Sequence, residues 1–215
     1  GAPSQSQGGE EQRDAGSIHL AGLSGCFDPE RTQARQGERQ NLVTLRGING
    51  YILFFMHVLI EPLLNEARCR AITEQLQRAE EHWRPGTETA GWHAREVKAN
   101  HQLDRHSSLH ETLATELQDQ LHRHPLLQAV AFPRRIHSML FSRSGVGEGY
   151  GRHVDNAWMG GGRSDLSFTV ALSDPNNYDG GALVLESPSG EEAFRLPAGH
   201  ALVYPSTLLH RVDPV

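Results

Sequence analysis

The sequence predicts an α+β fold in which helices come before a barrel of short strands. Two stretches with helical periodicity, 61–83 and 108–130, occur first, and five short strand-like stretches follow Pro133. Helices followed by closely spaced strands are typical of α+β proteins, and many short strands with polar turns favour a jelly-roll barrel. The chain has 215 residues, enough for one domain with a substantial core.

Residues 1–55 differ in composition from the rest of the chain. Their first part is polar, rich in Gly and Gln and without periodicity, and such a composition buries too little surface to offset the entropy lost on ordering. Met56 is the first methionine. We expect 1–55 to be a disordered extension or a mis-set start, with a regulatory tail as the alternative. Residues 56–135 would be the helical region and 136–215 the barrel core.

The first predicted helix covers residues 61–83. Glu61 and Pro62 suit its first turn, and the sequence Arg84-Pro85-Gly86 ends the pattern. Between them, apolar residues recur at helical spacing, namely Leu64, Ala67, Ala71, Ile72, Leu76 and Ala79.

The second predicted helix starts at Ser108, which suits an N-cap, with Glu111 three residues later completing a capping box. Pro125 is expected to break or end its regular part. An apolar stripe along this helix predicts burial against the core, and it consists of Leu109, Leu113, Leu117 and Leu121.

Five strands are predicted after Pro133 from their content of Val, Leu, Phe and Thr and from the turn signals between them. They are 136–141, 166–172, 182–186, 193–196 and 201–204.

Composition excludes several classes of partner. The net charge of −6 and the pI near 6.1 provide no basic field for nucleic acid. The longest apolar run, residues 51–60, is too short to cross a bilayer. Cys26 and Cys69 form neither a disulfide framework nor a metal-binding spacing. We therefore expect a cytoplasmic protein without nucleic-acid or membrane partners.

The most informative motif is His153-Val-Asp155, followed much later by His210. Residues i and i+2 of a strand project to the same face, so one more ligand from another strand would complete a site. Two histidines and one carboxylate that leave positions open are typical of non-haem Fe(II) oxygenases. With 13 histidines in the chain, the pair alone could also arise by chance.

The segment Tyr150-Gly-Arg-His153-Val-Asp155-Asn156 resembles the iron motif of prolyl-hydroxylase-type Fe(II)/2-oxoglutarate dioxygenases. Further blocks resemble the bacterial PKHD-type hydroxylases, over about residues 56–215. These blocks are Val97-Lys-Ala-Asn-His-Gln-Leu-Asp104, Arg163-Ser-Asp-Leu-Ser, Leu172-Ser-Asp-Pro, Tyr178-Asp-Gly-Gly181-Ala-Leu-Val, Leu196-Pro-Ala-Gly and Val203-Tyr-Pro-Ser-Thr-Leu-Leu-His210.

This resemblance implies a double-stranded β-helix core with helices packed on it. It implies that His153, Asp155 and His210 are the catalytic ligands of Fe(II), and that 2-oxoglutarate and O2 are cosubstrates. Oxidative decarboxylation of 2-oxoglutarate to succinate and CO2 would accompany hydroxylation of an unknown substrate. A link to iron homeostasis and the use of ascorbate are further expectations from the family.

The sequence departs from the family pattern at two places. The arginine that anchors 2-oxoglutarate would lie beyond Val215, so we expect the last strands of the barrel to be missing, and the exposed edges could pair in a homodimer. Arg211, next to His210 on a strand, should point away from the iron face.

The second departure is Ser144, which occupies the position where related prolyl hydroxylases often have a tyrosine that contacts 2-oxoglutarate. Tyr150 and Tyr204 are candidate cosubstrate contacts instead, with ordinary packing as the alternative for each.

Two other functions stay open at this point. The chain could be a cupin-like protein that binds metal without turnover, or an inactive fragment. Trp158 and Met159, in the loop after the iron pair, could line the substrate site or cap the barrel, and Gly160-Gly-Gly162 would make this loop a mobile lid.

Overall fold

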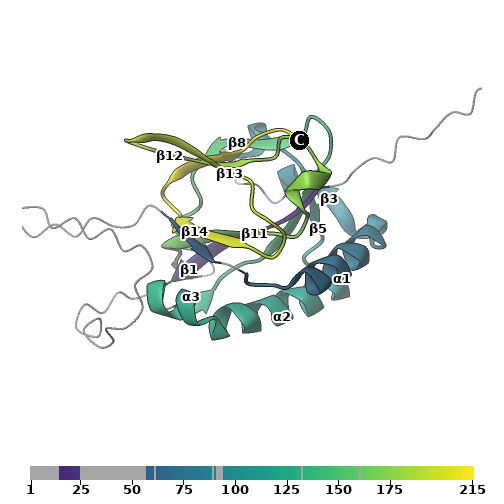
Figure 1. The fold of residues 1–215 in the computed structure, drawn as a ribbon, viewed down its shortest axis with the longest axis horizontal. Coiled ribbons are helices and arrows are strands. Elements are labelled where there is room, and N and C mark those ends of the chain that lie inside the picture. The colour runs from purple at the N-terminus through teal and green to yellow at the C-terminus, as the bar shows by residue number, and fades with distance from the viewer. Residues whose placement is uncertain are drawn as a thin grey trace, which may run out of the picture.

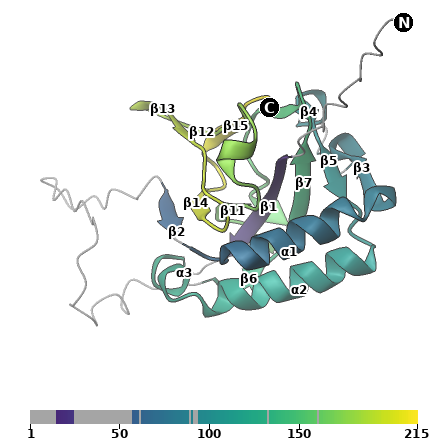
Figure 2. The ribbon, with the colours of Figure 1, turned by 45° about the vertical axis from the view of Figure 1, so that its right-hand side comes forward.

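The computed structural model describes residues 15–24, 57–60, 62–88, 90, 94–131, 133–159 and 161–215. Two antiparallel sheets face each other, and the helices lie along the outer face of the larger sheet (Figure 1). Figure 2 shows the same layers from a second direction, with helices α1 (Glu66–Gln77) and α2 (Ser108–Arg123) beneath the strands. The predicted α+β class is confirmed.

The larger sheet has eight strands in the order β2-β14-β11-β1-β7-β5-β3, and β6 pairs with β1 outside this path. These strands are β1 (Ala15–Ser24), β2 (Val58–Ile60), β3 (Trp83–Pro85), β5 (His101–Leu103), β6 (Arg135–Ile136), β7 (Leu140–Ser144), β11 (Leu166–Ala171) and β14 (Ala201–Pro205).

The smaller sheet has five strands in the order β13-β12-β15-β8-β4. They are β4 (Lys98–Ala99), β8 (Gly149–His153), β12 (Leu183–Ser187), β13 (Gly190–Phe194) and β15 (Leu209–Val212). Only Asn100 separates β4 from β5, so the chain passes there from the smaller sheet to the larger one. A separate hairpin pairs β9 (Trp158–Met159) with β10 (Gly162–Arg163).

Helix α1 is shorter than the sequence predicts at both ends, whereas α2 begins one residue earlier than predicted. The side chain of Asn65 accepts a hydrogen bond from the Arg68 N–H, so α1 begins after Asn65 and Pro62 lies outside it. Ser107, one residue before the predicted cap, accepts from the His110 N–H at the start of α2. Pro125 ends this helix and starts α3 (Pro125–Val130), as expected.

The remaining helical turns are short 3-10 segments: η1 (Glu80–His82), η2 (Gly86–Glu88), η3 (Ala94–Glu96) and η4 (Pro175–Asn177). Among the described helices, none is both long and apolar enough to cross a membrane.

Strand β1 differs from the sequence expectation for residues 15–24. It lies in the middle of the larger sheet, where Ser17 is opposite Ala171 of β11 on one side and Ser142 of β7 on the other. Ile18 and Leu20 are two residues apart, the spacing of side chains on one face of a strand. This short pattern was not recognised because the longer segment around it is polar in composition. The rest of 1–55 lies outside the described residues.

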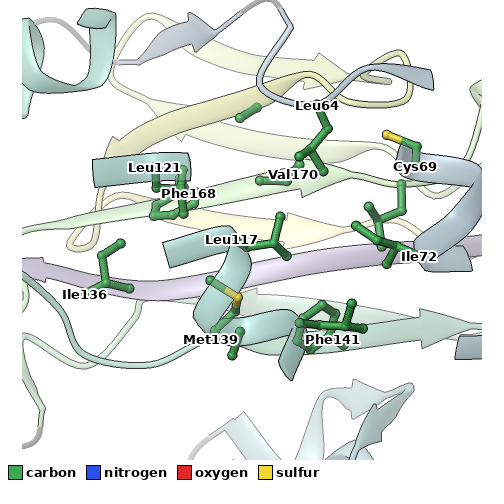
Figure 3. Close-up of a cluster of buried hydrophobic side chains, with 14 of the residues drawn as sticks. Leu64, Cys69, Ile72, Leu117, Leu121, Ile136, Met139, Phe141, Phe168 and Val170 are labelled. Carbon is green, nitrogen blue, oxygen red and sulfur yellow. The ribbon is translucent and has the colours of Figure 1, made fainter. Parts of the chain in front are cut away.

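The main core fills the space between the helices and the larger sheet (Figure 3). Leu117 and Leu121 of α2, two of the leucines expected to be buried, pack there with Phe168 and Val170 of β11. Because strand side chains alternate between faces, Ser167 and Thr169 of β11 belong to the opposite face, which faces the smaller sheet. One face of β11 thus packs in the main core, and its other face lines the interior of the barrel.

Candidate metal centre

His153, Asp155 and His210 come together between strands β8 and β15. His153 ends β8, and His210 lies directly opposite it on β15. The Asp155 carboxylate is 3.7 Å from the Nε2 atom of each histidine. The ligand atoms of the three residues all lie within 4.8 Å of one another. No other group of three such side chains close enough to hold a metal occurs among the described residues.

Both imidazole rings are held by the backbone. His153 Nδ1 lies 2.8 Å from the carbonyl oxygen of Gly151, and His210 Nδ1 lies 2.8 Å from that of Leu208. A carbonyl oxygen can only accept a hydrogen bond, so Nδ1 carries the proton in each ring. The lone pair of each Nε2 is then free for a metal, in the orientation that metal-binding histidines need.

The electrostatics of the site favour neutral histidine at His153. Burial, followed by the neighbouring His210, lowers the pKa of His153 to about 4. At neutral pH its imidazole is therefore unprotonated, as a metal ligand must be.

Asp155 is positioned by two contacts although it lies beyond the end of β8. Its N–H donates to the Ser206 carbonyl oxygen at 2.9 Å. The hydroxyl of Ser167, a fully buried residue of β11, donates to carboxylate atom Oδ2. Sequence reasoning missed Ser167, since a serine within a strand carries no signal of this role.

The two tyrosines proposed from the sequence contact the histidines. The Tyr150 ring stacks on His153 with centroids 3.6 Å apart, and Tyr204 packs edge-on against His210 at 5.0 Å. The Tyr204 hydroxyl lies 3.4 Å from Thr169 Oγ1 inside the barrel. Burial, then the nearby Asp155, raises the pKa of both phenols, so they stay protonated and can donate hydrogen bonds.

A buried lysine next to this group was not predicted. Lys98 of β4 pairs with Tyr150 of β8, and its Nζ lies 5.0 Å from the centre of the Tyr150 ring. The residue is 7% exposed. Burial, and then the charge of Arg105, lowers the pKa of Lys98 to about 8, while Asp155 acts in the opposite direction.

Arg211 turns away from the centre, as expected. It forms ion pairs with Glu186, Glu191 and Asp213.

Trp158, in the loop that the sequence predicted as a lid, is 66% exposed on the β9–β10 hairpin. Of the predicted lid glycines, Gly160 lies outside the described residues.

Comparisons with known proteins agree with this geometry. The family model of the 2OG-Fe(II) oxygenase superfamily matches residues 139–215. A PKHD-type hydroxylase of Synechococcus elongatus is 52% identical over 164 residues, which cover 74% of this chain and 73% of the relative. A PKHD-type hydroxylase of Prochlorococcus marinus is 48% identical over 160 residues, which cover 74% of this chain and 72% of the relative.

A solved structure supports the fold. The crystal structure of a Pseudomonas putida prolyl-4-hydroxylase matches with a TM-score of 0.53 at 20% sequence identity, covering 74% of this chain and 86% of that chain. At this identity the likeness concerns the arrangement of the strands and helices alone.

Proposed function

The chain belongs to the PKHD-type hydroxylases of the 2OG-Fe(II) oxygenase superfamily, and we propose that His153, Asp155 and His210 hold its Fe(II). This assignment rests on one observation: the ligand atoms of His153, Asp155 and His210 lie close together. His153 ends β8, Asp155 follows it two residues later, and His210 is on the neighbouring strand β15. This donor set suits a facial triad, which leaves further positions for cosubstrates.

The reaction class follows from the family: the chain is a 2-oxoglutarate-dependent hydroxylase. When bound, Fe(II) supplies the redox chemistry that couples decarboxylation of 2-oxoglutarate to hydroxylation of a substrate C–H bond. The chain's own residues orient the ligands and exclude water. The Gly151 and Leu208 carbonyls fix the imidazoles, Ser167 fixes the carboxylate, and the barrel interior keeps His210 only 3% exposed.

Tyr150 and Tyr204 are the proposed cosubstrate contacts. Both phenols lie against a triad histidine, and the Tyr204 hydroxyl faces Thr169 in the barrel interior, where it could donate to a carboxylate oxygen. Substitution of either tyrosine by Phe should weaken 2-oxoglutarate binding while Fe(II) binding is retained. Unchanged 2-oxoglutarate affinity in both variants would assign the two rings to packing alone.

The test of the function is an anaerobic titration with Fe(II) and then with 2-oxoglutarate, followed through the visible charge-transfer band of the chelate. We expect a saturable band in the wild type and none in His153→Ala. His122→Ala, which changes an exposed histidine of α2, should behave as the wild type. Fe(II) binding without a band would instead indicate a metal-binding protein without turnover.

Several finer expectations belong to this proposal. The link to iron homeostasis and the use of ascorbate as a reductant would follow from the family. A cytoplasmic location and a homodimer are also proposed. The outer strand β13 has mostly exposed residues and offers an edge for pairing. Size-exclusion chromatography with light scattering tests the dimer, and succinate formation with and without ascorbate tests the reductant.

A further inference from the structure

The turn between β14 and β15 contacts two of the three proposed metal ligands. The Leu208 carbonyl oxygen accepts a hydrogen bond from Nδ1 of His210. The Ser206 carbonyl oxygen accepts one from the Asp155 N–H at 2.9 Å. A bond from the Leu208 N–H to the Pro205 carbonyl oxygen closes the turn. One short turn therefore influences the position of both ligands.

Asp155 depends on this turn because it lies beyond the end of β8. Pairing between β8 and β15 places His153 opposite His210, but the main chain at Asp155 is outside the strand. Its N–H bond to Ser206 links it to the turn, and the Ser167 hydroxyl donates to its carboxylate. Ser206 thus fixes the backbone of Asp155, and Ser167 fixes the rotation of its side chain.

Ser206 also holds the segment that joins Asp155 to β11. Its N–H donates to the Asp165 carbonyl oxygen at 3.0 Å, and its hydroxyl donates to the Ser164 carbonyl oxygen at 2.5 Å. The Ser164 N–H donates to the Ala157 carbonyl oxygen at 3.0 Å, which joins the two ends of the segment. Both ends of the β9–β10 hairpin region are therefore held at one residue.

The contact between Ser206 and Ser164 is shielded from solvent. Ser206 is 0% exposed and Ser164 is 1% exposed. Removal of a buried hydrogen bond leaves its partner unsatisfied, so loss of the Ser206 hydroxyl should loosen the segment. The Ser164 hydroxyl, by contrast, has no hydrogen-bond partner among the described residues. The two residues thus carry two buried hydroxyls, of which only that of Ser206 makes a hydrogen bond to this segment.

We propose that Ser206 is a positioning residue for the hydroxylation reaction. Its hydroxyl holds residues 156–164 against the β14–β15 turn and so keeps the Asp155 carboxylate close to the two histidines. This inference rests on the proposed function, since it assumes that the triad holds metal. Ser206 acts through Asp155, and groups that orient a metal ligand in this way usually change metal affinity by about 10–100-fold.

The first test compares Ser206→Ala with Ser164→Ala in anaerobic Fe(II) titrations. Ser206→Ala removes the bonded hydroxyl, and we expect the Fe(II) affinity to fall by about tenfold or more. Ser164→Ala is the matched control, because it removes a similarly buried hydroxyl that has no hydrogen-bond partner in the described part of the chain. Its affinity should equal that of the wild type. Ser206→Thr keeps the hydroxyl and should recover most of the affinity.

Co(II) absorption separates a change in site geometry from a loss of stability. The visible bands of Co(II) depend on the number and arrangement of its ligands. At saturating metal, a variant that is less stable but has an unchanged site should show the wild-type spectrum. Ser206→Ala should show altered bands, whereas Ser164→Ala should keep the bands of the wild type.

A third measurement uses the wild type alone and does not depend on how the variants fold. If the segment and the turn orient Asp155, metal binding must stabilise their hydrogen bonds in return. Zn(II), a diamagnetic ion that accepts histidine and carboxylate ligands, should slow hydrogen exchange at the N–H groups of Asp155, Ser164 and Ser206. The control is the N–H of Ala171 at the end of β11, which donates to the His200 carbonyl oxygen.

The inference is overturned if Ser206→Ala and Ser164→Ala have the same Fe(II) affinity and the same Co(II) bands. Exchange that Zn(II) slows no more at the three N–H groups than at Ala171 would also overturn it. Should Ser206→Ala fail to fold, the exchange measurement decides. A wild type that binds neither Fe(II) nor Co(II) would instead contradict the proposed function itself.

Discussion

His153 and His210 are direct cross-strand partners on β8 and β15, with ring centroids 4.2 Å apart. A register shift follows within the same pair of strands, between His210 and Val212. The relative placement of the two imidazoles is therefore set by main-chain pairing rather than by a flexible loop. Their Nδ1 contacts to backbone carbonyls then fix the rotation of each ring, so the site is organised before a metal binds.

Ser167→Ala should weaken Fe(II) binding by about 10–100-fold, the usual effect of losing a group that orients a metal ligand. The Ser167 hydroxyl donates to Asp155 Oδ2, and without it the carboxylate loses its orientation. Anaerobic Fe(II) titration gives the affinity. Ser142→Ala is the control, since Ser142 is also a buried serine of the larger sheet but interacts with Gln102. Equal losses in the two variants would contradict the role of Ser167.

The metal-free protein should lose stability as the pH falls from about 6.5 to about 4. The pKa of His153 is lowered to about 4 by burial and by His210, whereas an exposed histidine titrates near 6.5. Between these values the unfolded chain binds more protons than the folded one, so the free energy of unfolding rises with pH and levels off above about 6.5.

Thermal unfolding in chelator at several pH values tests this effect. His153→Asn lacks the titrating group but keeps the other buried histidines, such as His110, whose pKa burial also lowers. The stability difference between wild type and variant should therefore change with pH across this window. Parallel pH profiles would show that His153 is not protected from protonation in the folded state.

Arg211→Gln should lower the melting temperature by a few degrees and leave Fe(II) affinity unchanged. Arg211 and Arg152 share Glu186 and Glu191 in a network on the outer surface of the smaller sheet. Partly exposed networks of this kind stabilise modestly and are screened by salt, so the difference in melting temperature should shrink at high ionic strength. A large loss of Fe(II) binding would place Arg211 in the site, contrary to the geometry.

The sequence predicted those features that depend on local pattern. Leu113, Leu117 and Leu121 repeat at helical spacing and are buried, and the His-x-Asp pair with a later histidine indicated the triad that the structure brings together. Predicting these features requires only the residue spacing of a helix or strand and the chemistry of the side chains.

Features that depend on tertiary pairing were missed. Lys98 stands in a two-residue strand, and its burial arises from pairing with Tyr150 and from the close approach of Gly86. Ser167 has its role only because β11 faces the centre. Strand β1 comes from a segment of polar composition, and its place between β7 and β11 follows from long-range pairing that no local period records.

Gly199→Ala should destabilise the protein far more than Gly147→Ala. Both glycines have positive φ, +84° and +78°, so each substitution costs about 1–2 kcal/mol for the left-handed backbone. At Gly199 the added Cβ would also lie 1.9 Å from the Leu64 carbonyl oxygen, whereas at Gly147 it would meet nothing within 4 Å.

The clash at Gly199 cannot be relieved by moving one side chain. The Gly199 carbonyl oxygen accepts hydrogen bonds from the N–H groups of Leu63 and Leu64, which join β2 to α1. Displacing this connection would break both bonds and disturb the buried Leu64, so we expect a loss above about 3 kcal/mol in urea unfolding. Similar midpoints for the two variants would mean that the β2–α1 connection does not pack on the turn before β14.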